Sequence, residues 1–536
     1  MRRLATALLV LALALTACTD DDNDGPPGAL TYDSNPSVLN IVAGSEQEAV
    51  FTQIVTPWCQ RTKLTCNLTK LGSVDQARLL QSGEAPYDAF WFASSVFEQI
   101  GNTSHKLRDV APMFSTPVVF AGWRSEMDKL GFVGREVSIQ DVLAAVESNK
   151  TKVWVTNPTQ SNSGATVLLG FLNHFAGNQV GEPLTQQQLD SAPVKDGITR
   201  FARAFDKTPP STGTLMDDCV ADPNECRTMF TYESLVMERN AELVKAGKEP
   251  LYAVYPTGSL AISDAPLGFF PHGDNAEKAA NFKKLQSYLL STEAQNKLVE
   301  LGRRPIASIG LSLPNPPREV FNTAWGIRPT INGQPITYPT APVIEAALSN
   351  YHGLYRTPAD LVYCIDGSGS MDGNGGWDGV KQAADLLFDP VQSKKYLLQA
   401  NPADKTTALV FASEVKGGPW TVRGADLTQI GVDVKNQSPG GGTGIYRCLG
   451  RAAEQFQGPP TPDRKRLVIL MTDGANTDGG PEGLDAIARA GVPVVAVGFG
   501  DEIDENTMRS IAARTRGTYL KSNDMVSALR EATGYR

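Results

Sequence analysis

The chain has 536 residues, which is too many for one hydrophobic core and predicts two or three domains. Hydrophobic residues make up 41% of the sequence and charged residues 20%, as in an ordinary globular protein. The formal net charge of -9, with no run rich in Lys and Arg, argues against a protein that binds nucleic acid.

The N-terminus has the pattern of an export signal. Met1-Arg2-Arg3 is positively charged, and residues 4–15 are nearly all Leu, Ala and Val, a stretch too short to span a bilayer comfortably. The next four residues, Leu-Thr-Ala-Cys18, resemble a bacterial lipobox. This resemblance implies that residues 1–17 are a cleaved signal peptide and that the thiol of Cys18 carries a diacylglyceryl group. The alternative is an ordinary secretory signal that happens to precede a cysteine.

Residues 18–36 are acidic and rich in Pro and Gly, which predicts a flexible tether. No later stretch is apolar over enough residues to cross a membrane. We therefore expect a protein of the bacterial cell envelope that faces outside the cytoplasm and is held at the membrane by its lipid alone.

The remaining six cysteines are an even number in an exported chain, which favours disulfides. Four form two close pairs, Cys59 with Cys66 and Cys219 with Cys226. The last two, Cys364 and Cys448, then pair by elimination or stay as free buried thiols. A zinc site is disfavoured because the short pairs lack metal-finger spacing and the chain has only four histidines.

Residues 37–352 alternate short apolar strands with helical patterns, and small polar residues follow the strands. Examples are "VLNIVAGSE", "YDAFWFASS" and "KVWVTNPTQSNSGATVLLGF". This order is typical of an α/β fold that binds ligands at the carboxyl ends of its strands. The segment resembles the bacterial extracellular solute-binding proteins with the periplasmic type II fold. The resemblance implies two lobes that close on a ligand, with "TPVVFAGW" and "LYAVYP" as the expected crossing segments.

The resemblance also suggests which residues line the cleft between the lobes. The predicted ligand contacts are Ser45, Ser94, Ser95, Ser163, Thr166, Tyr232 and Glu233. Each serine or threonine is equally suited to capping a helix or forming a turn, which is the alternative interpretation. No cluster of Arg or Lys accompanies them to indicate a free oxyanion, so the small-molecule ligand stays unidentified.

Residues 355–536 form a second α/β unit. Its predicted strands, such as "ADLVYCID", "KRLVILMTDG" and "VPVVAVGFG", are almost continuously apolar. Strands of this kind are buried on both faces, so we expect a doubly wound parallel sheet.

The stretch "LVYCIDGSGSMDG" breaks from an apolar strand into small polar residues. Asp372 stands where a dinucleotide fingerprint needs its third glycine, and neither a Walker lysine nor a nucleophile elbow is present. A hard divalent cation fits better, because it prefers hydroxyl, carboxylate and water oxygens. The candidate ligands are Asp366, Ser368 and Ser370, followed along the chain by Thr443 and Asp473.

This constellation resembles the von Willebrand factor A (VWA) domain and its metal-ion-dependent adhesion site. The resemblance implies a Rossmann-like fold in which Ser368, Ser370 and Thr443 hold Mg²⁺, with Mn²⁺ or Ca²⁺ as substitutes. Asp366 and Asp473 would then act mostly through bound water. An Asp or Glu of a protein partner would complete the metal shell. The alternative is that DGSGS is only a tight turn before a helix.

Together these features predict a surface lipoprotein that recognises its partners without catalysis. One alternative is a solute receptor for an ABC importer with an accessory VWA domain. Another is a metal-assisted hydrolase, but the sequence offers no convincing base or nucleophile beside the expected metal.

Overall fold

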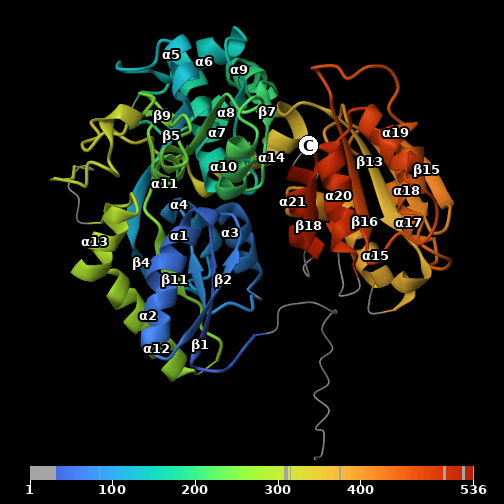
Figure 1. The fold of residues 1–536 in the computed structure, drawn as a ribbon, viewed down its shortest axis with the longest axis horizontal. Helices are drawn as coiled ribbons and strands as arrows, with labels where there is room; N and C mark the ends of the chain where they lie inside the picture. Colours follow the sequence, from blue (N-terminus) through green and yellow to red (C-terminus); the bar gives the residue numbers. More distant parts are fainter. Residues whose placement is uncertain are drawn as a thin grey trace, which may run out of the picture.

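The structure of the protein is a computed structural model. It describes residues 32–83, 85–179, 181–273, 275–306, 312–313, 315–373, 376–498, 503–521 and 525–534. The predicted signal peptide, Cys18 and most of the predicted tether lie outside these residues. Two α/β modules lie side by side in Figure 1. Among the described helices, none is both long and apolar enough to cross a membrane.

The first module has two lobes, and lobe 1 is built on a five-stranded mixed sheet. Its strands in spatial order are β2 (Thr65–Lys70), β1 (Val38–Ala43), β3 (Ala89–Trp91), β11 (Pro266–Phe269) and β4 (Arg108–Pro112). Strand β1 runs parallel to both of its neighbours, whereas β11 runs antiparallel to β3 and β4. The lobe 1 helices are α1 (Glu48–Val50), α2 (Thr56–Arg61), α3 (Ser73–Ser82), α4 (Ser95–Gly101), α12 (Ala276–Leu289) and α13 (Thr292–Glu300).

Lobe 2 is built on a seven-stranded sheet. Its main path is β10 (Ala261–Ser263), β5 (Phe114–Trp123), β8 (Thr228–Tyr232), β6 (Val153–Trp154) and β7 (Phe205–Lys207), and β9 (Leu251–Val254) and β12 (Arg304–Pro305) also pair with β5. Its helices are α5 (Arg124–Lys129), α6 (Ile139–Glu147), α7 (Asn162–Phe175), α8 (Gln186–Leu189), α9 (Ala192–Arg203), α10 (Thr212–Ala221) and α11 (Glu233–Lys245).

The chain crosses between the lobes at places that differ from the prediction. It leaves lobe 1 at Met113, between β4 and β5, so most of "TPVVFAGW" lies inside the lobe 2 sheet. The prediction for "LYAVYP" is wrong, because its strand β9 pairs antiparallel with β5 within lobe 2. The return crossing is the short stretch between β10 and β11. An apolar run indicates a buried strand, but it does not indicate which sheet the strand joins.

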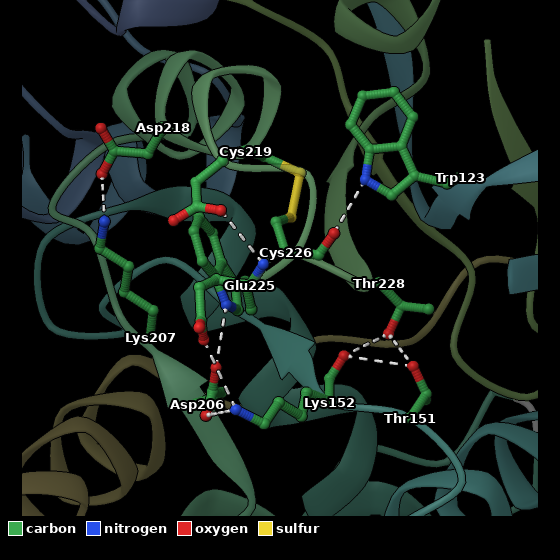
Figure 2. The surroundings of a disulfide bond; sticks show 12 residues. Trp123, Thr151, Lys152, Asp206, Lys207, Asp218, Cys219, Glu225, Cys226 and Thr228 are labelled. Atoms are coloured by element: carbon green, nitrogen blue, oxygen red, sulfur yellow. Dashed lines mark hydrogen bonds and ion pairs between the residues drawn. A yellow bond between two sulfur atoms is a disulfide. The ribbon is translucent and has the colours of Figure 1, made fainter. Parts of the chain in front are cut away.

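The six cysteines form the three predicted pairs. Cys59–Cys66 joins α2 to β2, and Cys219–Cys226 joins α10 to the segment before β8. In Figure 2 the second pair lies beside Trp123, whose Nε1 donates to the Cys226 carbonyl at 2.8 Å. The third pair, Cys364–Cys448, lies within the second module.

A linker that includes α14 (Ala341–Asn350) leads to the second module, in which six strands form one sheet. Their spatial order is β15 (Val415–Arg423), β14 (Lys405–Phe411), β13 (Ala359–Asp366), β16 (Lys465–Thr472), β17 (Val494–Gly498) and β18 (Thr518–Lys521). All neighbours run parallel except β15, an antiparallel edge strand that follows β14. The predicted doubly wound sheet is confirmed, with this one added antiparallel strand.

Alternate residues of the central strands enter two separate hydrophobic cores. On β13, Leu361, Tyr363 and Ile365 enter one core, whereas Val362 and Cys364 enter the other. Helices α15 (Gly376–Phe388), α17 (Thr428–Lys435) and α21 (Met525–Gly534) contribute to the first core, and α18 (Ile445–Ala453), α19 (Glu482–Arg489) and α20 (Glu505–Thr515) contribute to the second. The short helix α16 (Pro390–Lys395) follows α15. Burial on both faces explains why these strands are apolar throughout.

Candidate functional site

The five predicted metal ligands gather at one edge of the second module's sheet. Asp366 is the last residue of β13, and Asp473 directly follows the last residue of β16. The two strands are parallel neighbours, so their carboxyl ends meet. Ser368 Oγ and Ser370 Oγ lie 3.0 Å apart, and Ser370 Oγ donates to Asp473 Oδ1 at 2.8 Å. We call Asp366, Ser368, Ser370, Thr443 and Asp473 the metal centre.

Asp366 is buried and already has protein donors on both carboxylate oxygens. The Ser368 N–H donates to Oδ1 at 2.8 Å, and Thr472 Oγ1 donates to Oδ2 at 2.5 Å. Burial raises the pKa of the Asp366 carboxyl, and these hydrogen bonds oppose the rise. Protein donors thus hold both carboxylate oxygens of Asp366 in place.

Thr443 reaches the same place from the loop before α18. A Cβ added to Gly474 would lie 3.7 Å from Ser370 Oγ and 3.8 Å from Thr443 Oγ1, so both hydroxyls flank the same stretch of backbone. The Thr443 N–H donates to Thr477 Oγ1 at 2.8 Å, and the Thr477 N–H donates back to the Thr443 carbonyl at 2.8 Å. These reciprocal bonds fix the Thr443 backbone beside the end of β16.

Two loops of the metal centre are tied directly to each other. The Gly369 N–H donates to the Gly441 carbonyl at 2.8 Å, and the Gly440 N–H donates to the Gly367 carbonyl at 2.9 Å. Lys416 Nζ donates to the carbonyls of Gly367 and Ser438, each at 2.6 Å. The loop after β13 and the loop that carries Thr443 are therefore held in one arrangement.

All five side chains of the metal centre offer oxygen donors. Across the described ranges, no group of three or more His, Cys, Asp or Glu side chains is placed to hold a metal ion. The metal centre instead offers three hydroxyls and two carboxylates, which are the hard oxygen donors that Mg²⁺ prefers. The residues present therefore fit a hard divalent cation.

In the first module, one of the predicted cleft residues, Ser45, contacts the opposite lobe, whereas Ser163 makes its contact within lobe 2. Ser45 Oγ, in lobe 1, accepts from the Gly213 N–H of lobe 2 at 2.9 Å. Ser163 Oγ lies 2.8 Å from Thr212 Oγ1 in the same first turn of α10. A second contact runs from the Val74 N–H of lobe 1 to the Gln160 carbonyl of lobe 2 at 3.2 Å. The structure thus has the lobes closed.

Ser94 and Thr166 make local contacts, whereas Ser95 contacts the crossing stretch between β10 and β11. Ser94 caps α4, where its Oγ accepts from the Val96 N–H at 3.4 Å. The Ser95 N–H and Oγ both donate to the Asp264 carboxylate. Thr166 Oγ1 donates to the Ser163 carbonyl within α7 at 3.0 Å.

Tyr232 and Glu233 are buried at the end of β8 and the start of α11. The Tyr232 hydroxyl accepts from Asn162 Nδ2 at 2.8 Å, and burial together with the nearby Glu46 charge raises its pKa. Glu233 accepts from Arg304 Nε at 2.8 Å and Nη2 at 2.6 Å, and also from the Tyr255 hydroxyl. Glu233 is thus held in a buried ion pair.

Sequence reasoning missed several buried polar groups around these residues. Glu46 Oε1, Gln47 Oε1 and Asn162 Oδ1 are buried oxygens without a hydrogen-bond partner among the described residues. Glu46 is only 6% exposed, and burial raises the pKa of its carboxyl to about 7. The signal was present in the sequence, because Glu46 and Gln47 follow Ser45 directly at the end of an apolar strand. We call Ser45, Glu46, Gln47, Asn162, Ser163 and Tyr232 the interlobe site.

The nearest arginines of the first module are already paired with carboxylates. Arg303 contacts Glu238 and donates to the Glu46 carbonyl at 2.6 Å, and burial lowers the pKa of Arg303 to about 9. Arg304 is paired with Glu233. The Arg303 charge lowers the pKa of Glu46 only slightly against the larger effect of burial, and neither arginine donates to the unpartnered side-chain oxygens of the interlobe site.

Comparison with known proteins identifies both modules. Residues 39–304 match the family model described as bacterial extracellular solute-binding protein, and residues 360–533 match the von Willebrand factor type A domain. No curated protein matches the sequence.

Several solved structures are similar to the chain. The sulfate-binding protein SubI from Mycobacterium tuberculosis H37Rv is 15% identical, covers 58% of this chain and 95% of its own, and has a TM-score of 0.40. Maltose-bound MalE3 from T. maritima is 13% identical, with coverages of 59% and 92% and a TM-score of 0.41. A von Willebrand factor type A protein from Catenulispora acidiphila is 19% identical, with coverages of 34% and 42% and a TM-score of 0.28. The chain thus joins a bacterial extracellular solute-binding domain (39–304) to a VWA domain (360–533).

Proposed function

We propose that this protein is a non-catalytic recognition protein that binds a protein partner through a divalent cation on its VWA domain. The observation that carries this proposal is the convergence of five oxygen-bearing side chains at one edge of the sheet. Ser368, Ser370 and Thr443 would hold Mg²⁺, and Asp366 and Asp473 would act through water. A bound cation supplies a positive charge that accepts a partner's oxygen.

The choice of donors supports a binding role rather than catalysis. Because Asp366 and Asp473 would act through water, the direct protein ligands would be neutral hydroxyls that leave the cation strongly positive, so a carboxylate from an Asp or Glu of the partner would complete the shell. Ser370 is exposed at the surface, where a partner has access to it. All four histidines precede residue 353, so the VWA domain contains no histidine to act as a base.

Calorimetric titration of the full chain with Mg²⁺ tests the metal half of this proposal. We expect saturable binding that is lost in Ser370→Ala and Thr443→Ala and kept in Ser510→Ala, a matched change at an exposed position of α20. Equal Mg²⁺ binding by all four proteins would contradict the proposal. A pull-down from envelope extract, with and without Mg²⁺, then tests for the protein partner.

The interlobe site binds a small polar ligand that brings hydrogen-bond donors. Support comes from the three buried, unpartnered acceptor oxygens on Glu46, Gln47 and Asn162. A buried acceptor without a donor costs about 1–3 kcal/mol, which a ligand with hydroxyl or amino groups would recover. An oxyanion has only acceptors and would face the same oxygens without compensation.

A thermal-shift panel on the full chain tests this ligand class. We expect a polyhydroxylated or amine-bearing compound to raise the melting temperature, and Glu46→Gln to weaken that effect. Glu48→Gln is the matched control, because Glu48 is exposed in the next helix and pairs only with Lys70 at the surface. Stabilisation by sulfate or molybdate alone would contradict the class, and no stabilisation by any compound would contradict ligand binding itself.

A second candidate function is delivery of that ligand to an ABC importer, which the match to the solute-binding family over residues 39–304 favours. Uptake of the stabilising compound by cells with and without the gene tests this second function.

We further propose that the protein is anchored by lipid on Cys18, because the sequence Leu-Thr-Ala-Cys resembles a lipobox. Metabolic labelling with a fatty acid, lost in Cys18→Ser, tests the anchor.

A further inference from the structure

The VWA domain contacts lobe 1 of the solute-binding domain through buried polar groups. Arg530, in the last helix α21, donates from Nε to Asp75 Oδ1 of α3 at 2.5 Å. Only 5% of the Arg530 side chain and 10% of the Asp75 side chain are exposed. From the same lobe, Arg78 Nη1 donates to the Lys395 carbonyl of α16 at 2.6 Å.

The same helix also contacts lobe 2. Arg530 Nη2 donates to the Thr159 carbonyl at 2.8 Å. The Gly534 carbonyl, at the end of α21, accepts from Asn157 Nδ2 at 3.3 Å and from Thr208 Oγ1 at 3.0 Å. The three lobe 2 partners are buried. A single guanidinium therefore joins Asp75 of lobe 1 to Thr159 of lobe 2.

Helix α21 is firmly part of the VWA domain. Ala528, Leu529 and Ala532 are buried in the same hydrophobic core as α15 and β17. In Figure 1, α21 lies on the side of the VWA domain that faces α3 and α14. The first residue of β16 adds another contact on this side, because Lys465 Nζ donates to the Asp206 carbonyl of lobe 2 at 3.2 Å.

We propose that the VWA domain is an intramolecular clamp that holds the two lobes closed and so regulates ligand exchange at the interlobe site. The regulatory part rests on the ligand-binding function proposed above, whereas the clamp itself does not. Opening of the lobes separates Asp75 from Thr159, and Arg530 can follow only one of them. The other bond must break, which leaves a buried charged or polar group unpartnered.

Hydrogen exchange on the full chain tests the clamp without any ligand. The Gly213 and Val74 amides report on closure, because each donates across the lobes, to Ser45 Oγ and to the Gln160 carbonyl respectively. In Arg530→Ala we expect both amides to exchange at least tenfold faster than in the wild type, since lobe opening no longer breaks a charge-assisted bond.

Arg514→Ala is the matched control, because Arg514 pairs with Asp485 of α19, inside the VWA domain. Asp75→Asn is a second test, and it leaves the VWA domain unaltered. In this variant the exchange rate of the Gly213 amide is the measure of lobe opening, because Val74 is next to the substituted residue. Unchanged exchange at Gly213 in both variants would overturn the clamp. Faster exchange confined to Val74 would also overturn it, since only local structure near α3 would have been lost.

The clamp and the ligand proposal fail in different ways. If no compound stabilises the protein but Gly213 still exchanges faster in Arg530→Ala, the clamp stands and the proposed ligand function falls. If a compound stabilises wild type and Arg530→Ala equally and exchange is unchanged, the ligand function stands and the clamp falls.

Discussion

The disulfide between Cys364 and Cys448 allows a quantitative prediction for the VWA domain. The two cysteines are 84 residues apart in sequence, and in the chain-entropy model a loop of that length contributes about 4.5 kcal/mol to stability. The Cys219–Cys226 disulfide, with a separation of 7, contributes about 2.4 kcal/mol in the same model. Replacing each pair with alanines should therefore destabilise the protein by clearly different amounts.

The longer disulfide also joins two parts of the metal centre. Cys364 lies two residues before Asp366 on β13, and Cys448 lies in α18, the helix that follows Thr443. Without the bond, these ligands are positioned by the remaining loop hydrogen bonds alone. We expect the Cys364→Ala, Cys448→Ala variant to bind Mg²⁺ roughly tenfold more weakly, a typical effect for losing a group that positions metal ligands.

Urea unfolding of the full chain measures the stability change, and scanning calorimetry separates the transitions of the two domains. The Cys219→Ala, Cys226→Ala variant is the control, because it removes a disulfide from lobe 2 and leaves the VWA domain intact. A loss of stability in the VWA transition no larger than the control's loss would refute the loop-entropy reasoning. Unchanged Mg²⁺ affinity would refute the positioning role.

Three further outcomes follow from buried charges and loop contacts. Glu233→Gln leaves the buried charge of Arg304 uncompensated, so we expect urea unfolding to show a free energy of unfolding lower by about 3–5 kcal/mol. A decrease below about 1 kcal/mol would contradict a stabilising role of this ion pair. Lys416→Met removes the two side-chain hydrogen bonds by which Lys416 ties the metal-centre loops and leaves the two backbone bonds between them, so calorimetry should record roughly tenfold weaker Mg²⁺ binding. Wild-type affinity would count against this role of Lys416. The carboxyl of Glu46 has a pKa raised from 4.5 to about 7, so its contribution to stability is fully present below pH 4.5 and is lost as the pH rises to 7, because in that window the unfolded chain loses this proton and the folded chain keeps it. The stability lost between pH 4.5 and 7 should be about 3 kcal/mol. Melting curves of Glu46→Gln, measured over the same pH range, should not show this loss. The same pH profile in the variant and the wild type would argue against a buried, protonated Glu46.

Much of the VWA domain could be predicted because its signals are local and strong. The continuous apolar run before Asp366 indicates a strand buried on both faces, and parallel strands bring their carboxyl ends together. That rule alone places Asp473, which follows β16, beside Ser370, although 103 residues separate them. The edge strand β15 carried no comparable signal, since one face is exposed and glycines interrupt it.

Other features depend on contacts that no local pattern encodes. "LYAVYP" has the composition of any buried strand, so its sheet could not be assigned. The family resemblance suggests Glu233 as a ligand contact, but its pairing with Arg304 depends on how a distant segment returns to β5. The partners Arg530 and Asp75 are 455 residues apart, and nothing in either neighbourhood indicates the other.

Two features of the VWA domain lie at opposite ends of neighbouring parallel strands. Asp366 of the metal centre ends β13, whereas Lys465, which donates to lobe 2, begins β16. Strand β13 begins at Ala359, next to the linker, and ends seven residues later at Asp366, a length of roughly 23 Å. The proposed protein partner would bind at the carboxyl end of β13, whereas the other end of the strand adjoins the linker. The proposed small-molecule ligand would bind at the interlobe site of the other module. The two proposed sites share no residue, so this one chain would offer separate places for a protein and a solute.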